Sequence, residues 1–222
     1  MRIELIDHGF IQYLNHEHIE KVLCKNYEGC TVYYYNKPPK FLPVECTVYN
    51  DTLGFPVSED GTMLFTTSWE NGLTAYYIAD GSVVWRYKRT RMKDIFTYPS
   101  YVIASRYGKS IIKYDLNTGE ILAEMNSSTI TKAWELPSPY ILVEMIRGKL
   151  SVVNTETMTV VKAYKENTIN PNHCLSLLIQ GCQLKDNALW IYGIERYANY
   201  DDTAENPTPY ARVIDDDFLA GL

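Results

Sequence analysis

The residues best suited to bind a metal ion are two histidines that flank a glutamate, in His16-Glu17-His18. On a β-strand both imidazoles would lie on one face, as metal ligands can, whereas on a helix they would point about 200° apart. A stable metal site needs three or four ligands, and the local spacing offers no third one. We therefore interpret this segment as an ordinary surface turn or helix start. His8 and His173 are isolated and predict no catalytic role.

The motifs of nucleophilic and phosphate chemistry are absent from the sequence. There is no Gly-x-Ser-x-Gly elbow, no cysteine-protease signature, no Gly-x-x-x-x-Gly-Lys loop and no Gly-x-Gly-x-x-Gly. Carboxylates such as Asp80 and Asp115 lie at expected turns, where such side chains usually cap backbone amides. The sequence therefore favours a protein that is not an enzyme and holds no metal or cofactor, with an active site assembled from separated loops as the open alternative.

Aromatic and acidic residues gather near the C-terminus. One acidic segment runs from Tyr200 to Asn206, and a second runs from Asp215 to Leu219. Tyrosine is enriched at interface hot spots and aspartate supplies electrostatic steering, so the two segments suit a basic protein partner. A solubilising tail and an extended loop are the alternative, because like charges in a row repel. The expected partner-binding residues are Tyr197, Tyr200, Asp201, Asp202, Asp215, Asp216 and Asp217.

The net charge predicts the kind of partner. Lys and Arg number 21 and Asp and Glu 27, which gives a formal net charge of −6, and the pI is about 5.3. This charge disfavours binding to nucleic acid or to an anionic membrane and favours a basic protein. The one basic cluster, Lys88 to Lys93, could bind a phosphate. It is more typical of a solvated connection, because the wider basic footprint of nucleic-acid binders is missing.

The compartment is predicted from the apolar runs and the cysteines. No run approaches the roughly 18 apolar residues of a membrane helix, and the opening Met1 to Asp7 carries charges where a signal peptide is apolar. We therefore expect a cytoplasmic protein with no membrane partner. The five cysteines lack the spacing of a zinc knuckle or a redox pair, so we expect free, mostly buried thiols.

The elements that must position these residues are predicted to be strands, because Tyr, Val, Ile and Thr are frequent between scattered Gly and Pro. A strand–turn–strand unit occurs three times, at 76–84, 114–122 and 153–161. Alignment of Gly81, Gly119 and Met158 gives steps of 38 and 39 residues, close to the length of a four-stranded propeller blade.

Further strand pairs precede these hairpins, and looser units flank them. We therefore predict an all-β fold, a small β-propeller of five blades with about four antiparallel strands each. The expected blades of a single domain, 1–222, are 20–50, 57–91, 95–126, 133–165 and 174–216. We also expect Arg2 to Ile6 to pair with the last unit and close the sheet edge, and a short helix from Asn15 to Leu23.

Two phrases of the sequence, 57–65 and 112–122, resemble blades of WD40-like and quinoprotein-like (PQQ-like) β-propellers. The resemblance covers roughly residues 57 to 165. It implies a fold and not a function, since such repeats occur in scaffolds, enzymes and surface proteins alike.

Charge, motifs and repeats together favour a non-enzymatic, protein-binding propeller. Its sharpest form is an immunity protein that neutralises a nuclease-type toxin, because a nuclease is generally basic and an acidic domain would attract it. The alternative is an enzyme or sugar-binding propeller that holds a small ligand in its central opening between aromatic and carboxylate side chains.

Overall fold

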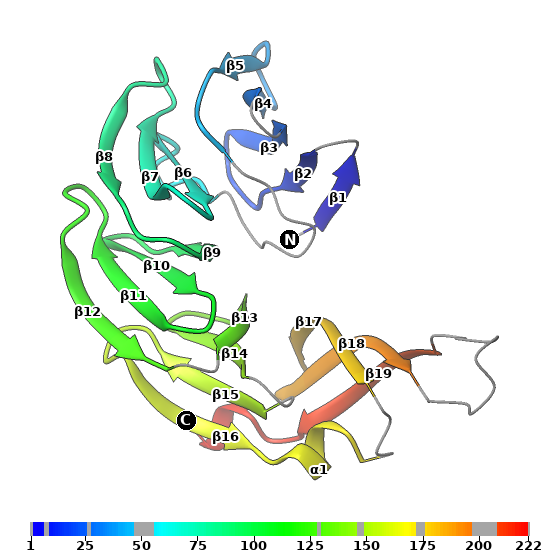
Figure 1. Cartoon of the computed structure of the whole chain (residues 1–222). Helices are drawn as coiled ribbons and strands as arrows, with labels where there is room; N and C mark the ends of the chain where they lie inside the picture. The colour runs from blue at the N-terminus through cyan, green and yellow to red at the C-terminus, as the bar shows by residue number, and fades with distance from the viewer. Residues whose placement is uncertain are drawn as a thin grey trace, which may run out of the picture. The chain divides into compact units, whose positions relative to one another are not determined.

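The computed structural model describes residues 2–6, 9–25, 28–46, 56–127, 130–145, 149–171, 176–196 and 208–221. The chain is all β apart from two short helices, and its strands form five antiparallel sheets that follow one another along the sequence (Figure 1). The predicted fold class, a small β-propeller of five blades, is confirmed. The chain divides into two compact units, Met1–Ser128 and Thr129–Leu222.

The first unit holds three sheets. The first sheet contains β1 (Arg2–Ile6), β2 (Gly9–Tyr13), β3 (Ile19–Lys25), β4 (Gly29–Tyr34) and β5 (Lys40–Leu42). The second contains β6 (Met63–Ser68), β7 (Gly72–Tyr77) and β8 (Val83–Tyr87). The third contains β9 (Met92–Thr97), β10 (Tyr101–Arg106), β11 (Ser110–Asp115) and β12 (Ile121–Asn126).

The second unit holds two sheets and two short helices. The fourth sheet contains β13 (Ile130–Glu135), β14 (Tyr140–Met145), β15 (Lys149–Asn154) and β16 (Thr159–Tyr164). The fifth contains β17 (Ser176–Lys185), β18 (Ala188–Arg196) and β19 (Thr208–Asp215). The helices are α1 (Glu166–Ile169) and the 3-10 turn η1 (Leu219–Gly221).

The helix expected from Asn15 to Leu23 is wrong, because β3 begins at Ile19 and pairs with both β2 and β4. The imidazole of His16 stabilises this start, since its Nδ1 accepts the backbone N–H of His18 at 3.0 Å and of Ile19 at 3.1 Å. Its Nε2 lies 3.1 Å from the carbonyl oxygen of Glu59. Both ring nitrogens are therefore engaged in the turn, as the surface-turn interpretation requires.

The strand expected at Arg2–Ile6 exists, but its predicted pairing with the last unit is wrong. β1 pairs with β2, from Arg2 opposite Tyr13 to Ile6 opposite Gly9. Only two residues separate the two strands, so closing this hairpin costs far less chain entropy than pairing with a strand at the other end of the sequence.

The turns of the three repeats share one backbone conformation. The φ angles of Gly81, Gly119 and Met158 are +76°, +71° and +55°. A left-handed residue at each matched position confirms the alignment, and Met158 adopts it without the freedom of glycine.

Short polar side chains hold these turns in place. The carboxylate of Asp80 accepts the N–H of Ser82 at 2.8 Å, and that of Asp115 accepts the N–H of Thr118 at 2.8 Å. In the third turn the side-chain oxygen of Asn154 accepts the N–H of Thr157 at 3.1 Å. These hydrogen bonds to the charged forms lower the pKa of Asp80 and of Asp115. Both carboxylates therefore cap backbone amides, as predicted.

A tryptophan joins the second sheet to the third. Trp85 on β8 is only 8% exposed, and its Nε1 donates a hydrogen bond of 2.9 Å to the carbonyl of Leu116. Its ring packs near Phe65 and Tyr114 and lies against Gly119, where an added Cβ would come within 2.5 Å of the indole. Glycine is therefore required here both by its φ angle and by the close approach of the ring.

Two cysteines depart from the expectation of free thiols. Cys24 on β3 and Cys30 on β4 lie directly opposite each other and form a disulfide. Cys46 and Cys182 are free, and Cys174 lies outside the described residues.

The substitution Trp85→Ala is expected to lower the free energy of unfolding by about 3 to 5 kcal/mol, because it empties a buried ring site between two sheets. A denaturant titration measures this loss. Tyr77→Ala removes a ring that is 46% exposed and serves as the control. A loss below about 1 kcal/mol for Trp85→Ala would contradict the core position.

Removing glycine from one repeat turn and introducing it into another are expected to change the stability of the protein differently. Gly119→Ala should destabilise the protein by at least about 2 kcal/mol, because the new methyl group meets the Trp85 ring and the φ angle is unfavourable. Met158→Gly should leave stability unchanged or raise it by up to about 1 kcal/mol, since the strain of a left-handed residue is relieved. Thermal or denaturant midpoints report both, and destabilisation by Met158→Gly as large as that by Gly119→Ala would refute the shared turn geometry.

Candidate partner-binding surface

The fifth sheet is a long antiparallel hairpin with a third strand added. β17 and β18 are joined by Asp186 and Asn187, whose φ angles are +51° and +67°. Two consecutive left-handed residues form the tight turn that suits twisted hairpins. β19 then pairs along β18 from Thr208 opposite Glu195 to Asp215 opposite Leu189.

One face of the fifth sheet is buried within the second unit. Ile179, Leu189, Ile191 and Ile214 are almost fully covered. The sheet is fastened at a bulge near Gln180, whose carbonyl oxygen accepts the indole N–H of Trp134 on β13 at 3.3 Å. The inner face is therefore core, and the bulge fixes how the hairpin meets the fourth sheet.

A buried ion pair adds to this anchoring. Glu195 on β18 is 4% exposed and accepts a hydrogen bond from the guanidinium of Arg212 on β19. Arg212 also donates to the carbonyl of Ile169 in α1 at 3.1 Å, and its guanidinium lies 4.7 Å from the centre of the Tyr210 ring. The pair is surrounded by intramolecular partners, so we assign it to structure rather than to recognition.

The opposite face of the fifth sheet is apolar and exposed. Leu178, Tyr192 and Val213 are 48%, 44% and 37% exposed. The register places them on one side of the sheet together with the half-buried Trp190 and Ile194. We call these five residues the outer face. Contiguous exposed apolar side chains that include Trp and Tyr are typical of protein-binding surfaces.

The inner strands of the second and third sheets do not share this exposure. In these sheets all six residues of β6 and five of the six in β7, β9 and β10 are buried, so both faces of these strands are covered. Along β18 burial alternates instead, with Leu189 and Ile191 inside and Tyr192 outside. Exposed apolar residues also occur on β8, β12 and β16, but these are edge strands, whereas the outer face includes residues of all three strands of the fifth sheet.

Small neighbours set the position of Tyr192. It pairs with Gly181 on β17 and with Ala211 on β19. A Cβ added at Gly181 would overlap the Tyr192 ring, so the ring lies across the glycine. An aromatic ring that covers a glycine in a neighbouring strand is held flat on the sheet with one side available to a partner.

The predicted acidic residues precede and follow β19 in the sequence. Tyr197, Tyr200, Asp201 and Asp202 belong to the segment that joins β18 to β19 in the sequence, and they lie outside the described residues. Asp215 ends β19, and Asp216 and Asp217 follow it. Twelve residues, 203–214, separate Asp202 from Asp215 in the sequence.

Asp215 is held within the second unit. Its Oδ2 accepts hydrogen bonds from Lys162 Nζ at 2.6 Å and from the Tyr164 hydroxyl at 2.8 Å. Burial alone would raise the pKa of Asp215, but the hydrogen bonds from Lys162 and Tyr164 favour the carboxylate, and the net effect lowers it. Its charge is therefore largely neutralised at close range.

The residues after Asp215 fold back onto the β17–β18 turn. The side-chain amide of Asn187 donates to Asp217 at 2.6 Å, and the backbone carbonyl of Asn187 accepts the N–H of Phe218 at 2.9 Å. Phe218 is fully buried, whereas Asp216 and Asp217 are exposed. Of the three terminal aspartates, Asp216 and Asp217 therefore present negative charge to solvent.

Sequence reasoning missed the outer face, although a signal is present. Residues 189 to 194 are apolar at every position except Gly193, so both faces of this strand carry apolar side chains. Such a run predicts a strand covered on both sides. Only the burial pattern shows that one side is open.

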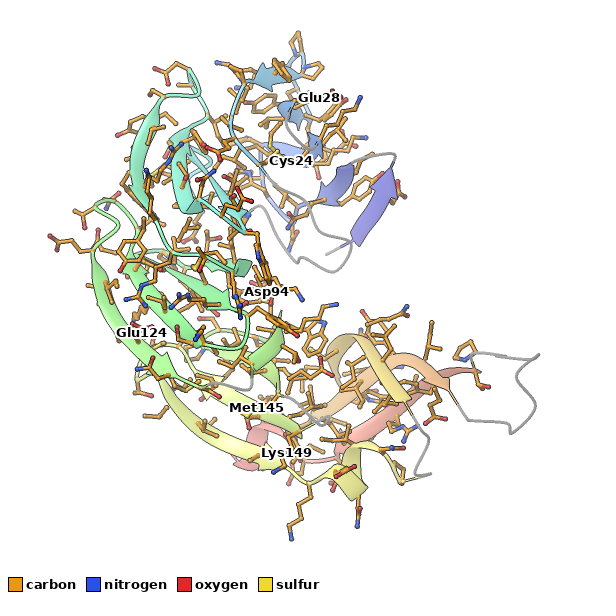
Figure 2. All side chains as sticks on the ribbon, viewed as in Figure 1. Cys24, Glu28, Asp94, Glu124, Met145 and Lys149 are labelled. Carbon is orange, nitrogen blue, oxygen red and sulfur yellow. A yellow bond between two sulfur atoms is a disulfide. The ribbon has the colours of Figure 1, made fainter. Side chains whose placement is uncertain are left out.

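The residues of the basic cluster contact other side chains of the first unit. In the basic cluster, Arg89 forms an ion pair with Glu124 at 2.6 Å, Arg91 lies 6.0 Å from the Trp69 ring centre, and Lys93 is 4% exposed. The buried carboxylate of Asp94, labelled in Figure 2, accepts the hydroxyl of Ser105 at 2.8 Å. Residues 88 to 91 form the expected connection between β8 and β9, whereas Lys93 lies on β9 and is buried, so the solvated connection is correct only in part.

Comparison with known proteins shows a fold and no family. No family model and no curated protein matches the chain. Solved structures do match it, 765 chains in all. One is the computationally designed Ika8 protein, with 12% identity and a TM-score of 0.55 over 85% of this chain and 54% of that one. The chain thus spans about half the length of that protein, and the likeness concerns fold alone. Within the described residues, no helix has the length and apolar character needed to cross a membrane.

The substitution Asp215→Asn is expected to lower the free energy of unfolding by about 1 to 3 kcal/mol at pH 7, because two charge-assisted hydrogen bonds are weakened. Asp215 has a lowered pKa in the folded protein, so its contribution is present above its unfolded pKa and is lost as the pH falls through the folded value. The variant should therefore lose less stability between pH 5 and pH 2 than the unaltered protein does. Asp216→Asn is the matched control with an exposed carboxylate, and an equal effect of both substitutions would contradict the pairing.

Proposed function

We propose that the protein is a non-enzymatic, protein-binding β-propeller that binds a basic protein through the outer face of its fifth sheet. The observation that carries the proposal is the exposed side of β17–β19, where Tyr192 and Trp190 lie among aliphatic residues. Aromatic side chains of this kind supply most of the binding energy when a partner covers them.

Charge supports a basic partner. The second unit contains twelve acidic and eight basic residues, against fifteen and thirteen in the first. Its acidic segments precede and follow β19 in the sequence, and the described Asp216 and Asp217 are exposed at the end of that strand. Negative charge around an apolar centre steers a positive partner and excludes negative ones.

The finer proposal is an immunity protein that acts in the cytoplasm and neutralises a nuclease-type toxin. A nuclease must hold phosphates and is therefore generally basic, and a tight, electrostatically steered inhibitor blocks it without chemistry of its own. The acidic chain, with its aromatic outer face, has both properties that such an inhibitor needs.

The product of the neighbouring gene is the partner to test, by measuring association and dissociation rates at two salt concentrations. Tyr192→Ala is expected to raise the dissociation rate at least about tenfold, because it removes a central aromatic contact. Tyr77→Ala, which removes a ring of similar exposure from β7, should leave both rates unchanged.

A second set of variants tests the steering charges. Replacement of Asp201, Asp202, Asp216 and Asp217 by Asn should slow association at low salt and affect dissociation little, since these charges act over about 8 to 10 Å before contact. Asp215 is excluded from the set because its loss would also destabilise the fold. An association rate that responds to neither salt nor these substitutions would refute steering. Absence of binding would instead favour the small-ligand alternative.

A further inference from the structure

Three sulfur atoms gather in the core of the first sheet. The Sγ atoms of Cys24, Cys30 and Cys46 all lie within 4.8 Å of one another. The three residues are 0%, 0% and 1% exposed. Figure 2 labels Cys24 on β3, beside Glu28 of the β3–β4 hairpin. The proximity joins two facing strands to a residue that follows β5, 16 positions after Cys30.

The backbone brings the third cysteine back to the hairpin. Val44 donates its N–H to Leu42 at 2.8 Å, which bends the chain directly after β5. The thiol of Cys46 then points to the hairpin and lies 3.3 Å from the carbonyl oxygen of Lys25. The three thiols thus come from separate backbone segments, and the fold, rather than a short sequence motif, assembles them.

The surroundings of the sulfurs are apolar. Val22, Val32, Leu42 and Val44 are buried in the same cluster. Among the described residues, no His, Asp or Glu joins the three cysteines within the same distance. The side-chain donor set is therefore three sulfurs, and the backbone carbonyls of Lys25 and Gly29 accept the hydrogen of the Cys46 thiol.

Sulfur ligands select thiophilic ions such as copper(I) and zinc. Structural zinc almost always takes four ligands, and this cluster supplies three. Around a trigonal ion with metal–sulfur bonds of about 2.3 Å, the sulfurs lie about 4 Å apart. Cys46 already lies within 4.8 Å of the other two sulfurs, whereas Cys24 and Cys30 are joined in a disulfide and must separate on reduction. We infer that the first sheet, in its reduced form, binds one copper(I) ion through the thiolates of Cys24, Cys30 and Cys46.

The disulfide and the metal site are two states of the same residues. An incoming dithiol transfers two electrons to the Cys24–Cys30 bond, becomes a disulfide itself, and leaves two cysteine thiols. The cytoplasm proposed for this protein keeps thiols reduced, so the metal-binding state is the one favoured there. Oxidation by a disulfide of the glutathione class reforms the bond and removes two of the three ligands.

Proton release accompanies binding. Copper(I) replaces the thiol protons, and its affinity should therefore rise with pH. The cluster lies in the first unit and the outer face in the second, so the inference shares with the proposed function only the reducing compartment.

The test titrates the reduced full chain with copper(I) supplied as its bicinchoninate complex. The unaltered protein should withdraw one equivalent, and Cys46→Ser should bind at least about 100-fold more weakly because one of three ligands is lost. Cys182→Ser changes the free cysteine outside the cluster and should bind as the unaltered protein does. X-ray absorption of the copper complex should show three sulfur neighbours and no nitrogen.

The oxidised, unaltered protein provides a test that needs no substitution. With the Cys24–Cys30 disulfide formed, it should compete for no copper at the concentrations at which the reduced protein is saturated. Circular dichroism of each variant checks that the sheet is intact. Equal binding by the oxidised and reduced forms, or by Cys46→Ser and the unaltered chain, would overturn the site. Tighter binding of zinc than of copper(I), measured by competition, would overturn the choice of ion.

Discussion

The need to cover two apolar faces of every sheet is the constraint on which this structure depends. A strand with apolar side chains on both sides is stable only if something packs against each side. The inner strands of the second and third sheets meet this need, and Trp85 shows how, because its indole contacts the turn of the next repeat and lies against Gly119. The repeat is thus defined by contacts between successive sheets as much as by hydrogen bonds within each one.

The first and fifth sheets, which lie at the two ends of the repeat series, deal with the same constraint differently. On the first sheet, Lys21 lies between Tyr13 and Tyr33, with its ammonium group 5.4 Å and 5.0 Å from the two ring centres. This arrangement mixes charge with aromatic surface and suits contact with water. The fifth sheet has no such cover on its outer face, where Leu178, Tyr192 and Val213 are exposed. A surface of that kind gains free energy when another protein covers it, and this asymmetry is the physical basis of the proposed function.

Much of the fold could be predicted because the same turn recurs in each of the three sequence repeats. Asp80, Asp115 and Asn154 all cap amides of equivalent turns, and each turn has its left-handed residue at the matched position, Gly81, Gly119 or Met158. This local chemistry is readable in one sequence. Strand pairing cannot be read from one sequence, because it depends on competition among strands. The sequence therefore predicts the wrong partner for β1 and a helix where β3 begins.

The candidate sites were predicted less well for the same reason. The disulfide of Cys24 and Cys30 follows from the register of β3 on β4, and the approach of Cys46 follows from the bend after β5. Neither is visible in cysteine spacing. Asp215 looked equivalent to Asp216 and Asp217 in the sequence, yet its neighbours Lys162 and Tyr164 come from a strand about 50 residues earlier. Long-range partners decide which charges remain available.

The hydrogen bonds that Asn187 makes with the residues after β19 have a consequence for protein synthesis. This one side chain binds Asp217 and the backbone of Leu219, and its own carbonyl binds Phe218. Phe218 lies after all the strands of the fifth sheet, so the last residues of the sheet fill a buried site that the earlier strands prepare. A chain that ends within β19 lacks Phe218 and leaves this apolar site unfilled. Chaperones and proteases act on such incompletely packed forms, so a truncated product should be removed while the full second unit persists.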